Sequence, residues 1–484
     1  MKRTNKGAQP VRVGQPPAES VEKRHPTEGN SGQATVTCTQ RQKPASSALA
    51  RVREAARRDS KQRFTSLLHH VNEELLRAAF DALRRAAAPG VDGVTWEQYD
   101  GEGLVERLAD LHDRVQSGRY RAKPSKRVWM PKSDGQQRPL GIAALEDKIV
   151  QQALGWVLQE IYEEDFLGFS YGSRPGRSQH NALDAIYVAI KCRKVNWVLD
   201  ADIRSFFDSV DHTWLMRFVE HRVADPRVLR LIRKFLRAGV SEDGQWSETV
   251  VGTPQGSVIS PLLANIYLHY ALDLWVQWWR ASAAARGEVY IVRYADDFVM
   301  GFQYRSDAQR FQAELRNRLE QFGLALHAGK TQFIEFGRFA SANRKERGEG
   351  KPETFDFLGF THICTKTWKG GRFTVRRKTI AKRLRTKIKE VKQLLMRRRH
   401  IPVPEQGRWL RSVVQGYFNY HGVPGNREAL NTFRTQINRA WLRALRSRSQ
   451  KGRSLTWERM TKLIATWIPT AKIVHPYPDQ RFCV

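Results

Sequence analysis

Two adjacent aspartates lie between two apolar stretches in residues 289–302. The stretches on either side of Ala295-Asp296-Asp297 have the length and composition of β-strands, so the segment is expected to form a hairpin with an acidic tip. Adjacent carboxylates repel each other, and burial adds a desolvation penalty. An Asp-Asp pair alone is compatible with an ordinary turn, but a buried pair requires compensating positive charge.

A third aspartate, Asp202, lies at the end of the apolar, strand-like run 195–203. Carboxylate oxygens are the ligands that suit Mg²⁺. Two such ions about 3.5–4 Å apart can hold the attacking and leaving oxygens of an in-line phosphoryl transfer. Asp202, Asp296 and Asp297 therefore indicate a metal-dependent phosphoryl-transfer site.

The charge of the chain indicates what this site acts on. The 484 residues include 82 Lys and Arg against 49 Asp and Glu, a net charge of +33, while 41% of the residues are hydrophobic. The apolar content predicts a folded protein, and so large a positive charge favours a polyanionic partner over a mere solubility bias. Nucleic acid is the first expectation, and an anionic membrane surface is the second.

Other classes of protein are disfavoured by what the sequence lacks. The four cysteines are isolated, which argues against a zinc finger or a disulfide framework and fits a reducing compartment. The apolar run 257–272 is too short for a transmembrane helix and is closed by Asp273. Lys2 and Arg3 are not followed by the apolar core of a secretory signal.

Positive charge is concentrated at the C-terminal end. Residues 371–484 contain 27 Lys and Arg against 5 Asp and Glu. Residues 378–399 have the spacing of a helix with one apolar stripe and one basic face. The arginines are interleaved with aromatic residues, and since cations hold phosphates and rings stack on bases, this region is expected to bind nucleic acid rather than only to be solvated.

Two turns in the middle of the chain could contact a nucleotide. Residues 127–141 resemble a β-hairpin with Lys132 and Arg138 on its two legs, where cations could hold a triphosphate. Residues 253–257 form a Gly-flanked turn containing Gln255 that leads into a helix. Each of these alone is equally compatible with an ordinary turn.

The element pattern is that of an α+β protein of about three domains. Helical spacing is expected in residues 64–88, 212–238, 262–279 and 306–322, with strands at 195–203 and 289–302. Residues 1–60 lack periodicity and are expected to form a basic, mostly disordered tail that turns helical near residues 48–58.

The order of sequence blocks resembles that of reverse transcriptases of the group II intron maturase type. The blocks span about residues 64–362 and are, in order, AAPGVDGVTW (87–96), MPKSDGQQRPLGI (130–142), FSYGSRPGRSQHNAL (169–183), LDADIRSFFDSVDH (199–212), GTPQGSVISPLLANIYL (252–268), VRYADDFVMGF (292–302), LALHAGKTQFIEFG (324–337) and FDFLGFTH (355–362). VVQGYFNYHGVPGN (413–426) and HPYPDQRF (475–482) are similar to the thumb or maturase region of intron-encoded proteins.

The resemblance implies a role for individual residues. Asp202, Asp296 and Asp297 match catalytic ligands of two Mg²⁺ ions, with Ile203 as a further metal-binding position. The positions implied to bind the incoming dNTP are Lys132, Arg138, Gln255, Lys330 and Phe207, the last as the ring that excludes a ribose 2′-hydroxyl. Those implied to contact nucleic acid are Arg174 on the template side and Arg383, Arg385, Lys389, Arg397, Arg398 and Arg399 in the basic helix.

The resemblance also implies an architecture and partners. It implies a right-hand polymerase with a tail at 1–60, fingers and palm at 61–365, an α-helical thumb or maturase domain at 366–455, and a small basic region at 456–484 that could bind DNA. The paired Cys and His ligands of an endonuclease domain are not found. The implied partners are group II intron RNA, target DNA, template–primer duplex and dNTPs, without a membrane; a homodimer and a bacterial cytoplasmic ribonucleoprotein are further expectations.

Three functions stay open from the sequence. The first is RNA-directed DNA synthesis combined with intron splicing and with mobility by target-primed reverse transcription. The second is RNA binding for splicing alone, although decayed maturases usually lose the paired aspartates that this chain keeps. The third is a host-adopted relative in defence or repair, whose catalytic core would look the same.

Overall fold

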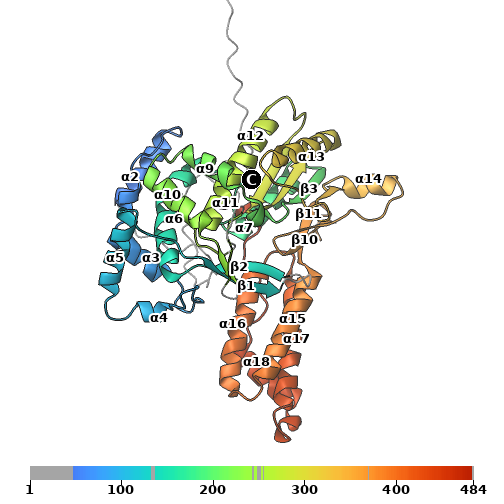
Figure 1. Cartoon of the computed structure of the whole chain (residues 1–484). Coiled ribbons are helices and arrows are strands. Elements are labelled where there is room, and N and C mark those ends of the chain that lie inside the picture. The colour runs from blue at the N-terminus through green and yellow to red at the C-terminus, as the bar shows by residue number, and fades with distance from the viewer. Residues whose placement is uncertain are drawn as a thin grey trace, which may run out of the picture.

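The computed structural model describes residues 47–131, 137–242, 245–247, 252–253, 256–368 and 370–481. Within these residues it is a mixed α and β protein, as expected, with a helical N-terminal region, a central four-stranded sheet and a helical C-terminal bundle (Figure 1). No helix in the described ranges is both long enough and apolar enough to cross a membrane.

The N-terminal region packs its helices around one long buried helix, α6. Its elements are α2 (Ser47–Arg58), η1 (Leu68–His70), α3 (Glu73–Ala82), α4 (Trp96–Tyr99), α5 (Leu104–Gln116), β1 (Ser125–Pro131), β2 (Gln137–Ile142) and α6 (Leu145–Asp165). The helix expected over 64–88 is shorter, because Asn72 caps α3 and the chain becomes extended at Leu83.

The start of the fold lies earlier than the predicted boundary at residue 60. Helix α2 buries Leu49, Val52 and Ala56 in the large hydrophobic core. The guanidinium of Arg53 donates to Glu164 of α6 at 2.9 Å. The turn to helix near residues 48–58 is thus confirmed, and these residues belong to the folded body; residues 1–46 lie outside the described residues.

The central region is built on a sheet of order β6-β7-β3-β8. Its helices and strands are α7 (Gln179–Cys192), β3 (Trp197–Asp202), α8 (Phe206–Ser209), α9 (His212–Glu220), α10 (Pro226–Arg237), β4 (Val240–Glu242), β5 (Gln245–Ser247), α11 (Ser260–Leu268), the π-helical turn η2 (His269–Asp273), α12 (Leu274–Ala281), β6 (Val289–Tyr294), β7 (Asp297–Phe302), α13 (Arg305–Glu320), β8 (Gln332–Glu335) and α14 (Ala340–Glu346). The hairpin predicted at 289–302 is confirmed as β6 and β7.

The two faces of this sheet meet different cores. Leu199 and Ala201 of β3 point into the large core with helices α9 and α11, whereas Val198 points into a second core with α7. Since side chains alternate along a strand, Asp200 and Asp202 lie on the same face as Val198. The sheet thus separates the acidic face from α9.

A three-stranded antiparallel sheet joins the central region to the C-terminal bundle. It consists of β9 (Phe355–Phe357), β10 (Phe360–Lys366) and β11 (Phe373–Thr379) in the order β11-β10-β9, and β10 and β11 form a hairpin. Thr365 of β10 pairs with Thr374 of β11. The predicted domain boundary between residues 365 and 366 is corrected, because it falls inside this hairpin; the helical bundle begins at α15.

The C-terminal bundle has its own hydrophobic core. Its elements are α15 (Ala381–Arg397), α16 (Val403–His421), α17 (Arg427–Arg446), η3 (Lys451–Ser454) and α18 (Trp457–Trp467), whereas the last helix, α19 (Pro478–Arg481), packs against α7 of the central region. The helices α15 to α18 project away from the central sheet (Figure 1). Met460 and Ile464 of α18 share a core with α15, α16 and α17. The separate region expected from residue 456 is corrected, since α18 is part of this bundle.

Candidate active site

The three predicted aspartates come together at one end of the central sheet. β3 and β7 are antiparallel neighbours, and their register places Asp202 directly opposite Asp297. Asp296 lies in the turn before β7, next to Ala295, whose φ of 57° is in the left-handed region. A non-glycine residue there is strained, and such strain persists only where the surroundings hold the backbone in place.

These carboxylates are buried close enough together to repel one another. Burial raises the pKa of Asp297 well above its ordinary value, and the carboxylates of Asp200, Asp202 and Asp296 raise it further. The pKa of Asp296 is also raised, mainly by burial. Arg383 acts in the opposite direction on Asp297. A bound cation would relieve this repulsion, because it favours the ionised form of each carboxylate.

Lys330 supplies one positive charge at the site. Its Nζ donates to Oδ2 of Asp202 at 2.6 Å, and the loop that carries it is fixed by the amide of His327, which donates to the carbonyl of Asp202 at 2.8 Å. The lysine side chain is 61% exposed, so it is free to leave toward solvent. Lys330 was expected near the nucleotide and here contacts a candidate metal ligand.

The donor types fit a hard divalent cation, although the present arrangement is not a complete metal site. In the part of the chain that the structure describes, no three His, Cys, Asp or Glu side chains are grouped to hold a metal. Asp202, Asp296 and Asp297 nevertheless act on one another electrostatically, and all three offer carboxylate oxygens. Ile203, the further expected position, is buried beside Asp202 and pairs with Leu326.

A buried arginine holds the turn that carries the aspartates. Arg293 is fully buried, and its Nε and Nη2 donate to the two oxygens of Asp273 at 2.7 and 2.5 Å. Its Nη1 donates to Asn265 at 3.1 Å and to the carbonyl of Ala295 at 2.9 Å, while Nη2 also donates to Ser170 at 2.7 Å. The guanidinium thus ties the strained residue to α11 and η2.

The backbone of Gly172 also lies close against the backbone of this turn. A Cβ at Gly172 would lie 2.4 Å from the backbone nitrogen of Ala295, so only glycine fits. The side-chain amide of Asn265 donates to the carbonyl of Gly172 at 2.7 Å. The position of the acidic turn is therefore set by neighbours that are themselves fixed.

The expected nucleotide-binding residues surround the acidic turn in part. Arg138 of β2 is exposed and lowers the pKa of Asp296, so its charge reaches the site. Phe207 is half-buried in α8, and its carbonyl accepts from the amide of Thr253 at 2.7 Å, which brings the turn at 252–253 against it. Lys132 and Gln255 lie outside the described residues.

The expectation that Arg174 contacts a template is corrected by its burial. The residue is 3% exposed, its guanidinium pairs with Glu163 at 3.1 Å, and it donates to the carbonyls of Leu167 and Ser170. These partners use the donors that a phosphate would need. Arg174 instead fixes the loop that precedes α7.

The basic residues expected to bind nucleic acid are displayed by α15 and the turn after it. Arg383, Arg385, Lys389, Arg397 and Arg398 are exposed and Arg399 is half-buried, whereas Ile388, Val391 and Leu395 on the opposite side are buried. Arg398 lies over the ring of Trp409, 4.9 Å from its centroid. The predicted apolar stripe and basic face are confirmed.

Asp200 and the ion pair of Arg293 with Asp273 were not found by reasoning from the sequence. Asp200 lies two residues before Asp202, and burial, followed by Asp356 and Asp202, raises its pKa to about 7. Arg293 and Asp273 form the buried pair behind the turn. The one available signal was Asp273, a carboxylate closing an apolar helical run, because such a group is buried only with a partner.

Comparison with known proteins identifies the class of this site. The family described as "Reverse transcriptase (RNA-dependent DNA polymerase)" matches residues 130–362. That range contains all three aspartates, Arg138 and Phe207. The chain is accordingly an RNA-directed DNA polymerase.

Individual relatives narrow the class. The chain is 36% identical to Protein YkfC of Escherichia coli over 300 residues, covering 54% of this chain and 78% of that protein. It is 33% identical to Group II intron-encoded protein LtrA of Lactococcus lactis over 229 residues, covering 47% of this chain and 38% of LtrA. A Putative COX1/OXI3 intron 1 protein of Saccharomyces cerevisiae is 26% identical over 307 residues, covering 54% of this chain and 36% of that protein. The chain belongs to the reverse transcriptases of the group II intron-encoded type.

Proposed function

We propose that this reverse transcriptase extends a primer from dNTPs on an RNA template, at a site where Asp202, Asp296 and Asp297 hold two Mg²⁺ ions. The observation that carries the proposal is the cross-strand pairing of Asp202 with Asp297 beside Asp296. Bound Mg²⁺ would supply charge stabilisation for the attacking 3′-oxygen and for the triphosphate.

The residues of the chain then position the reactants. Arg138 reaches the site from the β1–β2 hairpin and would bind the triphosphate, together with Lys132 and Gln255, as the sequence resemblance implies. The ring of Phe207 would occupy the space that a ribose 2′-hydroxyl needs. Lys330 would leave Asp202 as cations arrive and then face the nucleotide. In this account catalysis comes from positioning and charge neutralisation, and no protein nucleophile is required.

Primer extension tests the polymerase proposal. Purified protein should copy poly(rA) from oligo(dT) with dTTP and Mg²⁺, and Asp296→Ala/Asp297→Ala should reduce synthesis to background. Because Asp297 is buried among other carboxylates, its removal relieves repulsion and is not expected to unfold the chain. Equal synthesis by both proteins would contradict the assignment.

The C-terminal bundle is proposed to be the thumb of a right-hand polymerase and to bind intron RNA so that the RNA folds for splicing. Support comes from the exposed cations of α15 and from the names of the relatives, among them Nuclear intron maturase 4, mitochondrial, of Arabidopsis thaliana, 26% identical over 210 residues. Target DNA would be a further partner if the element is mobile. A splicing-only role is disfavoured because the acidic triad is intact.

Salt-dependent RNA binding tests the role of α15. Replacing Arg385, Lys389, Arg397 and Arg398 with Gln should weaken binding of a folded group II intron RNA. The slope of log affinity against log salt should fall by up to about 3, because each lost phosphate contact removes about 0.7–0.9. A control with the same charge change on other exposed sites, at Arg84, Arg316, Lys345 and Lys351, should retain most of the slope. Equal effects in both variants would exclude a specific role for α15.

A further inference from the structure

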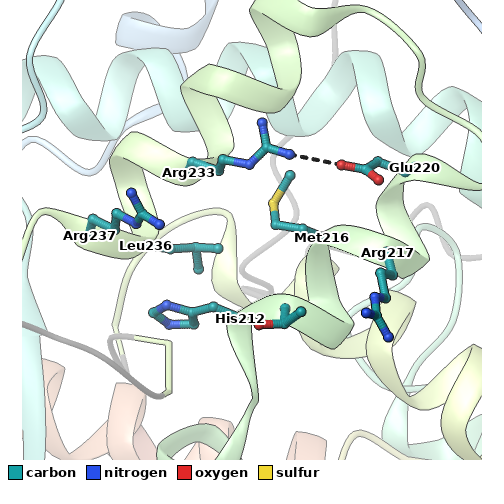
Figure 2. A pocket seen from close by; sticks show the side chains of 8 residues that line it. His212, Met216, Arg217, Glu220, Arg233, Leu236 and Arg237 are labelled. Carbon is teal, nitrogen blue, oxygen red and sulfur yellow. Dashed lines mark hydrogen bonds and ion pairs between the residues drawn. The ribbon is translucent and has the colours of Figure 1, made fainter.

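A pocket lies between α9 and α10, outside the acidic site (Figure 2). Its volume is about 310 Å³, at the lower end of the range for ligand pockets. Met216 and Leu236 form an apolar floor and are 7% and 3% exposed. Figure 2 shows Arg237 and Arg217 on opposite sides of this floor. The pocket therefore combines an apolar surface with cations at its rim.

The charge at the rim is left largely uncompensated. Glu220 is the one carboxylate that lines the pocket, and it pairs with Arg233 at 2.8 Å. Arg217 lies over the ring of Trp214, 5.0 Å from its centroid. Among the described residues, no carboxylate pairs with Arg217 or Arg237. Two guanidinium groups beside an apolar floor are suited to a ligand that has both a phosphate and a sugar or base.

Helix α10 carries the positive charge beyond the pocket. It has five cations and no acidic residue, and its opposite side is buried through Val228, Ile232 and Phe235. Arg230, one turn before Arg233 and two turns before Arg237, is exposed. A row of cations that continues past a nucleotide-sized pocket matches a polyanion better than a single nucleotide.

The position of the pocket separates it from the template–primer. α9 packs Leu215 and Phe218 into the large core that also contains Leu199 and Ala201, whereas Asp202 projects from the other face of β3. A strand bound at the aspartates would lie on the acidic side of the sheet. The pocket is therefore available to a second nucleic-acid segment.

We propose that the α9–α10 pocket binds one nucleotide unit of a structured RNA other than the template. Arg217 and Arg237 hold its phosphates, and its ribose or base packs on Met216 and Leu236. This inference rests on the proposed function, since it adds a second RNA-binding site, in the central region, to the basic face of α15. The ligand is an RNA strand and not a free dNTP.

The test compares two charge-reversed variants of the full chain. Arg217→Glu/Arg237→Glu changes the rim, and Arg84→Glu/Arg316→Glu makes the same change in net charge on other exposed sites. Binding of a folded group II intron RNA is measured across a salt series, with primer extension on short poly(rA)/oligo(dT) as a second readout. The rim variant should lose about tenfold or more in intron RNA affinity and lower the salt slope by about 2. Its primer extension should match that of the control.

Each other outcome has a definite meaning. Equal losses in the rim and control variants would show that only net charge matters and would overturn the inference. A raised KM for dTTP with unchanged RNA affinity would assign the pocket to free nucleotides and would also overturn it. If primer extension of the rim variant falls, Arg217→Gln and Arg237→Gln replace it, and each should lower the slope by about 1. A wild-type protein that neither binds intron RNA nor extends the primer would contradict the proposed function itself.

Discussion

At the scale of single residues, the acidic turn depends on Arg293. A guanidinium has five N–H donors, and all five of this one are used, by Asp273, Asn265, Ser170 and the carbonyl of Ala295. Lysine keeps the charge but lacks the planar fork that meets both oxygens of Asp273. Arg293 is thus a positioning residue, acting through the Ala295 carbonyl on the two aspartates that follow.

Arg293→Lys is expected to lower kcat for primer extension by about 10²-fold, since a misplacement of about 1 Å at a reacting group costs that much. KM for dTTP and RNA affinity should change little. Arg222→Lys is the matched control, because Arg222 is 2% exposed and its guanidinium binds Asp165 at 3.0 Å and the carbonyls of Ser60 and Ala56 in the N-terminal region. Both variants should lose thermal stability, but only Arg293→Lys should have a lower kcat when assayed at a temperature below its unfolding temperature. Equal kcat values for the two variants would refute the positioning role.

At the scale of elements, the C-terminal segment fastens the helical bundle to the central region. Lys191 of α7 donates to Asp479 at 2.5 Å, and Asp184 of α7 pairs with Arg481 at 3.3 Å. His475 stacks on His180 with ring centroids 3.7 Å apart. These contacts place the end of the described chain against α7, so the segment links the last helices to the face of the sheet that bears the aspartates.

The stacked histidines make this attachment sensitive to acid. Burial, followed by the neighbouring His475, lowers the pKa of His180 to about 3, and burial lowers the pKa of His475. Arg377 and Arg481 act in the same direction on both, whereas Asp184 opposes them at His475. The unfolded chain takes up protons on these histidines below about pH 6.5 and the folded chain does not, so stability falls as the pH falls through that window.

The variant His180→Asn/His475→Asn removes this contribution. When the pH is lowered from 7.5 to 5, its unfolding temperature should drop by roughly 2–4 °C less than that of the wild type. Differential scanning calorimetry at both pH values measures the two drops. Parallel drops would mean that the pair does not couple the segment to protonation. Comparing the two proteins cancels the opposite effect of buried acids such as Asp147 and Asp200, whose pKa values are raised.

At the scale of the whole molecule, the sequence was sufficient where a pattern is local. The acidic hairpin follows from two apolar strands around Asp296-Asp297, and the basic face of α15 follows from its spacing. The start of the folded body and the domain boundary near residue 365 could not be predicted from local patterns. Residues 47–58 join the body because their apolar side packs on α6, and the boundary near 365 fails because strand pairing crosses it.

The rest of the site depends on contacts between distant segments. Arg293 of β6 binds Asp273 of η2 and Ser170 of the segment beside β6, and neither partner can be paired with it from sequence spacing. Arg174 was misassigned because it lies in a Gly-rich stretch. The local sequence does not distinguish an arginine that binds a phosphate from a buried arginine that holds a loop in place. Burial decides between these roles, and burial is a property of the folded chain.

If Asp202, Asp296 and Asp297 bind the catalytic cations, Mn²⁺ binding can be measured at these residues by electron paramagnetic resonance. The wild-type chain with primer–template is expected to bind Mn²⁺ tightly, and Asp202→Asn/Asp297→Asn to lose this binding while keeping its RNA affinity. Asp356→Asn, which changes an exposed carboxylate near the site, should bind Mn²⁺ as the wild type does. Unchanged tight Mn²⁺ binding in the double variant would contradict the account.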